Sequence, residues 1–310
     1  MKINIANWGL DAWRTGDAKA VIEEIRLADR KGIYQYNIPD HILFVANPRD
    51  YPYAKNAGTE DFDGGMPFDP KTLNFLEPLT LFAAAAAVTK NIRLATAVLI
   101  APLRHAVFLA KQVATLDHIS NGRVDLAVGS GWLKEELEAL NAPAEKRMDY
   151  MIDQIKVCRA LWSHVPTSIH NRAANFDDVF CLPLPVQKPL PVWLGVALNA
   201  RNIERIADVA DGWMGAPIER DWQPAQIREP IRALRRAFEA RGRDPASATV
   251  QVTPAPVLGS NGKADLEATL KRIPKLEEAG VDVISLYTHQ YISHSDDYEA
   301  FLDRVVRFGR

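Results

Sequence analysis

The chain has 310 residues, of which 47% are hydrophobic and 25% charged, as is ordinary for a globular enzyme with a substantial core. Its formal net charge is −2 and its basic residues are scattered, so nothing indicates a nucleic-acid or membrane partner. Cys158 and Cys181 are too few for a disulfide framework or a structural zinc site, and because no HExxH or paired-carboxylate spacing occurs, we expect no metal.

The N-terminal third begins with a short apolar run, residues 3–6, which predicts a strand and not the apolar core of a signal peptide. Residues 18–32 are amphipathic and end at Gly32, as a helix does. Residues 33–42 (IYQYNIPDHI) predict a strand that ends in polar residues. Residues 43–75 are rich in Pro, Gly, Asp and Asn and have no periodicity, which is typical of a functional lid or insertion.

The same alternation of helices and strands continues to the C-terminus. The expected helices are 77–91, 105–120, a long tract through 134–140 and 148–162, 202–210, 225–242, 265–280 and 296–309. The expected strands are 91–100, 124–131, 190–197, 211–217, 249–257 and 281–287, and a polar, Pro-containing excursion at 163–189 could be a hairpin. We expect one domain over residues 1–310, a (β/α)8 TIM barrel with insertion loops. A doubly wound sheet is the alternative, but no GxGxxG follows the first strand.

Asp40 and His41 end the second expected strand, just before the irregular segment. In an α/β barrel the C-terminal ends of the strands line the active site. A histidine there can exchange a proton near neutral pH, and the neighbouring carboxylate could orient it or bind the edge of a ring. The structural alternative is a helix-capping Asp beside a surface His, but the strand-end position favours the functional interpretation.

Two further strand ends are candidates for ligand contacts. Gly129 and Gly131 would let the backbone approach a flat ligand while Ser130 bonds its edge, although such glycines can also serve only a tight turn. Residues 195–201 (GVALNAR) join a strand to a helix, where backbone N–H groups with Asn199 and Arg201 could bind an anion. Barrels often bind phosphate in this way after their seventh and eighth strands. The alternative is an ordinary N-cap by Asn199.

Several ordered motifs together resemble the luciferase-like monooxygenase superfamily. The densest match is residues 92–162, which include ATLDHISNGR at 114–123 and GSGWLKEE at 129–136. PDHILF at 39–44 and YPYA at 51–54 resemble the branch that depends on coenzyme F420. The resemblance continues through PVQKPLPVWLGV and ADGWMGAP and covers nearly the whole chain, most weakly in the last sixty or so residues.

The resemblance implies a flavin or deazaflavin site at the C-terminal end of the barrel, and a homodimer. The two cysteines and the N-terminal strand lead us to expect a cytoplasmic protein. It implies a non-prolyl cis peptide at Ala97–Val98 beneath the central ring, with Asp40 and His41 beside the ring. The remaining cofactor contacts that it implies are Ser130 and Gly131, the phosphate-proximal loop with Gly195, Val196, Asn199, Ala200 and Arg201, and, further out, Arg147 and Tyr150.

Two positions depart from the family pattern. Sugar-phosphate dehydrogenases of the superfamily carry an acid–base Glu where this chain has Trp132, which argues against that activity. Trp132, together with Trp8, would instead give the substrate pocket an apolar wall and favour a less polar substrate. The phosphate-proximal loop has Val196 in place of the second of two frequent glycines.

We therefore expect an oxidoreductase that transfers a hydride between F420 and a small, fairly apolar organic substrate, with His41 as proton donor or orienting group. An FMNH2-dependent monooxygenase supplied by a separate flavin reductase is the close alternative, because both cofactors share the ring and the phosphate. A flavin-binding barrel without turnover is the alternative from another class. A non-flavin barrel such as an aldolase would need a lysine at a strand end, and none is seen.

Overall fold

The computed structural model describes residues 1–7, 10–46, 74–215 and 223–308. Trp8 and most of the irregular segment 43–75 therefore lie outside the described residues. Within the described ranges, no helix is long and apolar enough to cross a membrane. The same ranges contain no cluster of three or more His, Cys, Asp or Glu side chains that could hold a metal ion.

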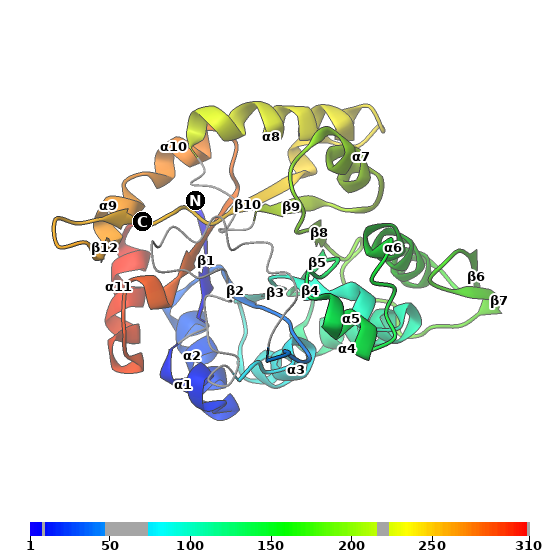
Figure 1. Ribbon diagram of the computed structural model, residues 1–310, viewed down its shortest axis with the longest axis horizontal. Helices are drawn as coiled ribbons and strands as arrows, with labels where there is room; N and C mark the ends of the chain where they lie inside the picture. Colours follow the sequence, from blue (N-terminus) through cyan, green and yellow to red (C-terminus); the bar gives the residue numbers. More distant parts are fainter. Residues whose placement is uncertain (8–9, 47–73, 216–222, 309–310) are drawn as a thin grey trace.

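Eight parallel strand positions close into a barrel, which confirms the predicted (β/α)8 fold (Figure 1). The strands run in the order β3-β2-β1-β13-β10-β9-β8-β5-β4, and β3 pairs with both β2 and β5, so that no edge remains open. A doubly wound sheet would leave two edges. The strands are β1 (Lys2–Ala6), β2 (Gln35–Ile38), β3 (Arg93–Thr96), β4 (Leu99–Ile100), β5 (Val124–Gly129), β8 (Val192–Leu194), β9 (Gly212–Gly215), β10 (Thr249–Val252) and β13 (Val283–Tyr287).

The helices surround the strands on the outside of the barrel (Figure 1). Amphipathic α2 shows why: Val21, Ile25 and Ala28 are buried, and the helix ends at Gly32, whose positive φ of 81° suits a glycine. The helices are α1 (Asp11–Thr15), α2 (Ala18–Lys31), α3 (Pro78–Val88), α4 (Ala106–Ser120), α5 (Lys134–Ala139), α6 (Arg147–Ser163), α7 (Ala200–Val209), α8 (Pro224–Glu239), α9 (Leu266–Leu270), α10 (Ile273–Glu278) and α11 (Tyr298–Phe308).

Two expected elements are divided in the structure. The strand expected over residues 91–100 is split into β3 and β4 on either side of Ala97–Val98. The helix expected over 265–280 is split into α9 and α10, because Pro274 has no backbone N–H with which to continue α9.

The excursion at 163–189 does contain a hairpin. Its antiparallel strands are β6 (Thr167–His170) and β7 (Asn175–Val179), which lie beside α6 at the periphery of the molecule (Figure 1). A second small pair, β11 (Val257–Leu258) and β12 (Ala264–Asp265), follows β10. These insertions do not interrupt the barrel strands.

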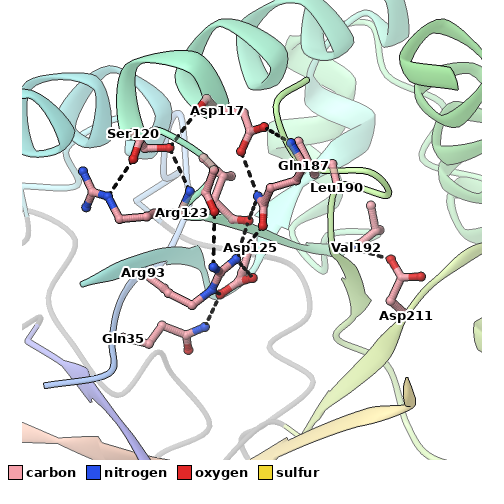
Figure 2. Close-up of polar contacts among 12 residues, drawn as sticks. Gln35, Arg93, Asp117, Ser120, Arg123, Asp125, Gln187, Leu190, Val192 and Asp211 are labelled. Atoms are coloured by element: carbon pink, nitrogen blue, oxygen red, sulfur yellow. Dashed lines mark hydrogen bonds and ion pairs between the residues drawn. The ribbon is translucent and has the colours of Figure 1, made fainter. Parts of the chain in front are cut away.

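A polar network spans the N-terminal end of the barrel, where β2, β3 and β5 begin (Figure 2). Arg93 donates two hydrogen bonds to the Asp125 carboxylate, at 2.8 and 2.6 Å, and Gln35 Nε2 donates a third at 2.7 Å. The Gln187 amide joins this network to Asp117 on α4. Because Arg93 and Gln35 together satisfy the buried carboxylate of Asp125, we interpret the N-terminal end of the barrel as structural. The chemistry is expected at the C-terminal end of the strands.

Candidate active site

A pocket of about 250 Å³ opens at the C-terminal end of the barrel. It lies among the residues at the ends of β2, β4, β5, β8, β9, β10 and β13, as expected for a barrel enzyme. Of the predicted site residues, the described part of this pocket includes Asp40, His41, Ala97, Val98, Ser130, Gly131, Trp132, Gly195 and Val196.

Val98 forms one wall of the pocket, between the ends of two neighbouring strands. The Ala97–Val98 peptide bond is cis, as the resemblance implied. A Cβ atom added at Gly129 would lie 2.6 Å from Val98 Cγ2, and one added at Gly195 would overlap with Val98 Cγ1. Only glycine at these two positions therefore leaves room for the Val98 side chain between the ends of β5 and β8. Ala97, Val98, Gly129 and Gly195 form a nearly flat part of the pocket lining, which we call the Val98 wall. Such a wall fits a flat ring.

Gly131 turns the chain sharply after β5. Its φ is +78°, and a Cβ atom there would lie 2.8 Å from Ile100 Cγ2, so the turn requires glycine. Arg147 Nε donates a hydrogen bond to the Gly131 carbonyl oxygen at 2.9 Å. Arg147 and the half-buried Tyr150 are not among the residues that line the pocket. Arg147 thus acts on the pocket through the turn that it holds.

Asp40 is engaged in a buried ion pair. Its two carboxylate oxygens accept hydrogen bonds from Arg104 at 2.6 and 2.9 Å, and one also accepts the Ile100 N–H at 2.8 Å. Arg104 Nη2 also donates a hydrogen bond to Glu77 Oε1, at 2.7 Å. No hydrogen bond joins Asp40 to His41 in this geometry. Asp40 lines the pocket, but its charge is neutralised by Arg104 and its bonds tie β2 to β4.

His41 is instead held by a glutamate that sequence reasoning did not select. Its Nδ1 lies 2.9 Å from Oε2 of Glu136 on α5. The other oxygen of Glu136 accepts the backbone N–H groups of Ile42 and Leu43, at 2.6 and 3.2 Å. The Glu136 side chain is only 1% exposed and that of His41 12%. This carboxylate therefore fixes both the imidazole and the chain that leaves it.

Aromatic rings surround the His41 imidazole. Its centroid lies 4.4 Å from that of Phe44, and 5.6 Å from those of both Phe75 and Trp132. Phe44 and Phe75 belong to the two described ends of the irregular segment, and Trp132 lines the pocket. The histidine thus has an apolar surrounding, and the predicted position of Trp132 in the pocket wall agrees with this geometry. The other predicted pocket tryptophan, Trp8, lies outside the described residues.

The loop predicted near a phosphate follows β8, the fifth barrel strand, and not the seventh or eighth. Gly195 and Val196 line the pocket, whereas Asn199, Ala200 and Arg201 do not. Asn199 is the N-cap of α7, where its side chain accepts the Asn202 N–H at 3.0 Å, and Ala200 and Arg201 are exposed. Asn199 therefore has the N-capping role that was the alternative to anion binding. An anion bound by Asn199, Ala200 and Arg201 would lie at the outer edge of this loop, outside the pocket lining.

Three functional candidates were missed by sequence reasoning: Glu136, Arg104 and Gln251. Glu136 lies within the GSGWLKEE motif, which was noticed for its start and not for its second Glu. Arg104 carries no local signal, because it is defined by a partner 64 residues away. Gln251 could have been found, since the polar residues Thr249, Gln251 and Thr253 alternate with Val250 and Val252 along β10 (Thr249–Val252) and just beyond it.

Comparison with known proteins agrees with this architecture. The family model described as luciferase-like monooxygenase matches residues 14–279, and the chain therefore belongs to the luciferase-like monooxygenase family. An uncharacterized protein of Mycobacterium tuberculosis is 34% identical over 234 residues, which cover 74% of this chain and 78% of that one. An FMNH(2)-dependent dimethylsulfone monooxygenase of Pseudomonas putida is 31% identical over 118 residues, which cover 37% of this chain and 32% of that one.

Solved structures show the same fold. The crystal structure of a long-chain alkane monooxygenase (LadA) superposes with a TM-score of 0.75 at 14% identity, over 99% of this chain and 90% of that one. An F420-dependent secondary alcohol dehydrogenase, in complex with an F420-acetone adduct, superposes with a TM-score of 0.73 at 17% identity, over 100% of both chains. At these identities the likeness establishes the fold alone.

Proposed function

We propose that this protein is a hydride-transfer oxidoreductase that uses coenzyme F420 to reduce or oxidise a small, neutral organic substrate. The observation that carries the proposal is that His41, which the buried Glu136 holds at Nδ1, lines the same pocket as Val98. A reduced deazaflavin supplies a hydride and reacts poorly with oxygen, so its protein needs to supply orientation, a dry pocket and a proton.

The residues fit a flat, uncharged ring system. Ala97, Val98, Gly129, Gly131 and Gly195 give a wall without protruding side chains. Val196 and Ser130 extend that wall toward its rim, and Asp40 supports it through Arg104. These residues would hold the ring, and the outer loop residues Asn199, Ala200 and Arg201, with Arg147 and Tyr150, are left for the more distant parts of the cofactor.

His41 can supply the proton that accompanies the hydride. Because Glu136 occupies Nδ1, Nε2 is the ring nitrogen left for the substrate. When the imidazole is protonated, Nε2 donates to the substrate heteroatom as the hydride reaches the adjacent carbon, and in the reverse direction it accepts that proton. Glu136 holds the ring in place and faces the imidazolium with a carboxylate. The apolar rings around His41 exclude water from this transfer.

Anaerobic turnover tests this proposal. Protein is mixed with reduced F420 and a panel of ketones, imines and enones, and the absorbance of the cofactor is followed in sealed, oxygen-free cuvettes. The proposal expects oxidation of the cofactor without oxygen, in stoichiometric amounts with reduced product. A strict requirement for oxygen together with an oxygenated product would overturn it.

A second candidate function is that of an FMNH2-dependent monooxygenase served by a separate reductase. It is favoured by the named relatives, since the dimethylsulfone monooxygenase and the pyrimidine monooxygenase RutA of Allorhizobium ampelinum are 31% and 30% identical over the matched regions. In that case the same wall would hold FMN, and Trp132 with the aromatic rings around His41 would shield the reacting oxygen from water. Incorporation of labelled oxygen into product distinguishes this candidate from the first.

A further inference from the structure

Gln251 carries a buried amide that the barrel itself does not satisfy. The residue is 1% exposed and lines the pocket. Neither its Nε2 nor its Oε1 has a hydrogen-bond partner among the described residues. A buried amide without partners costs free energy, and such groups in folded proteins are paired with few exceptions. The missing partner of Gln251 is therefore expected in the pocket.

The position of Gln251 in the barrel places it on the far wall from Val98. The residue lies on β10, where the alternation of side chains directs Gln251 and Thr253 to the interior and Val250 and Val252 to the helices. In the closed strand order, β10 and the β3–β4 position are four strands apart in both directions. A ligand that fills the pocket therefore has the Val98 wall on one side and the Gln251 amide on the other.

The charges around the pocket limit what that ligand can be. No lysine or arginine lines the described part of the pocket. The carboxylate of Asp40, which does line it, is already paired with Arg104. Among the described lining residues, a phosphate or carboxylate would find a counter-charge only at a protonated His41, whose strand β2 is three positions from β10 in the barrel, and a cation would find no unpaired carboxylate. An amide side chain offers an NH2 donor group and a carbonyl acceptor side by side, which matches a neutral group of the opposite pattern.

We propose that Gln251 is the polar anchor of the pocket and binds a neutral group in which a carbonyl and an N–H are adjacent, as in a carboxamide, lactam or imide. This inference rests on the proposed function for the identity of the ring, but not for the Gln251 contact itself. Two sources present the same CO–NH chemistry: the substrate, and the pyrimidine edge of a flavin or deazaflavin. The cofactor-side residues implied by the resemblance follow the ends of β2, β3, β5 and β8 or belong to α6 and the start of α7, and none of them comes from β10. We therefore expect the substrate to be the source.

The experiment uses benzamide and acetophenone as a matched pair of probes, since they differ in one N–H-bearing group. Their binding to the whole protein, with and without FMN or F420, is followed by quenching of tryptophan fluorescence, because Trp132 lines the pocket. Gln251→Leu removes both the donor and the acceptor of the side-chain amide, and Gln251→Glu removes only the donor. Gln112→Leu on α4, outside the pocket, makes the same chemical change as a control. Thermal unfolding checks that each variant is folded.

For a substrate anchor, the wild-type protein prefers benzamide to acetophenone by roughly tenfold, as one or two neutral hydrogen bonds supply. Gln251→Leu removes the preference and leaves cofactor affinity within about twofold. If the ring edge is the source, Gln251→Leu weakens cofactor binding roughly tenfold, and the probe preference exists only in the cofactor-free protein. Unchanged values for probes and cofactors in both Gln251 variants would overturn the inference, because water alone would then satisfy the amide.

The probe arm remains informative if the proposed function fails. Binding to the cofactor-free protein requires no turnover and no particular cofactor. A protein that shows the benzamide preference but needs oxygen for turnover would retain the Gln251 anchor and lose the hydride-transfer proposal. If turnover proceeds without oxygen but the Gln251 variants bind the probes and the cofactors as the wild type does, the hydride-transfer proposal is retained and the Gln251 anchor is lost.

Discussion

Nδ1 of His41 lies 2.9 Å from Oε2 of Glu136, although the two residues are 95 positions apart in the sequence. The pair joins the end of β2 to α5 and couples the imidazole to a carboxylate that is nearly inaccessible to solvent. This geometry makes His41 a candidate for general acid–base catalysis and Glu136 a residue that positions it.

Replacing either member of the pair should slow the reaction without unfolding the protein. His41→Ala should lower kcat by roughly 10²- to 10⁴-fold, since it removes the proton donor, with a smaller change in KM. Glu136→Gln should lower kcat less and alter the pH profile, because the amide cannot balance the imidazolium charge. Glu138→Gln, at an exposed position of the same helix, is the control. A His41→Ala rate within twofold of wild type would remove His41 from the mechanism.

Asp40→Asn should chiefly destabilise the fold. Arg104 is 9% exposed and would keep only its ion pair with Glu77, so the cost should be below the roughly 3–5 kcal/mol of a wholly uncompensated buried charge. Denaturant unfolding measures this change. Asp177→Asn removes the exposed His170–Asp177 contact, which solvent screens, and should leave the unfolding free energy essentially unchanged. Full stability with loss of cofactor binding would instead assign Asp40 a direct role at the ring.

Gly195→Ala should disturb the wall of the pocket. The added Cβ would overlap with Val98 Cγ1, so either Val98 or β8 must move, and we expect cofactor affinity to fall at least tenfold with a destabilisation of about 1–3 kcal/mol. Val98→Ala in the same chain removes the overlapping methyl groups and should restore part of the loss. Gly259→Ala serves as the control, because its Cβ would meet the end of the Asn261 side chain at 3.2 Å and the Lys263 carbonyl oxygen at an ordinary 3.6 Å. Additive losses in the double variant would argue against this packing account.

Glu24 should make stability depend on pH. It is 8% exposed, and burial raises its pKa to about 7 from an ordinary value of 4.5, although Asn7 and Ser295 donate hydrogen bonds to it at 2.5 and 3.3 Å. Since the folded state holds this proton more tightly, its contribution is complete below pH 4.5 and is lost as the pH rises to about 7. At roughly 1.4 kcal/mol per pKa unit, the loss is about 3 kcal/mol.

Unfolding free energies measured between pH 4.5 and 8, for the wild type and Glu24→Gln, test this prediction. The neutral amide has no proton to lose, so the variant should lack this decline and exceed the wild type above pH 7. Parallel pH curves for the two proteins would contradict the assignment.

The barrel could be predicted from sequence because its signals are local and periodic. Apolar runs alternate with amphipathic segments such as residues 18–32, and glycine ends that helix as expected. The cis peptide at Ala97–Val98 was anticipated through the family resemblance and not through periodicity, which indicated one unbroken strand there.

The site could be predicted only in part, because its chemistry depends on pairings between distant residues. Strand-end positions selected Asp40, His41, Trp132 and Gly195, and the structure places all four in the lining of one pocket. They could not show that Asp40 is tied to Arg104, which a neighbouring loop supplies. Nor could they decide between the two roles expected for Asn199; the structure shows the N-cap of α7, and Asn199 is not among the residues that line the pocket.

The central claim is that the Val98 wall holds a deazaflavin ring. Fluorescence titration of the cofactor-free protein with F420 and with FMN, each oxidised and reduced, tests it most directly. We predict saturable binding of one cofactor per chain, tighter for F420 than for FMN and weakened by Gly195→Ala. Preference for reduced FMN would favour the FMNH2-dependent monooxygenase over the F420-dependent enzyme. Failure of both cofactors to bind would contradict the central claim.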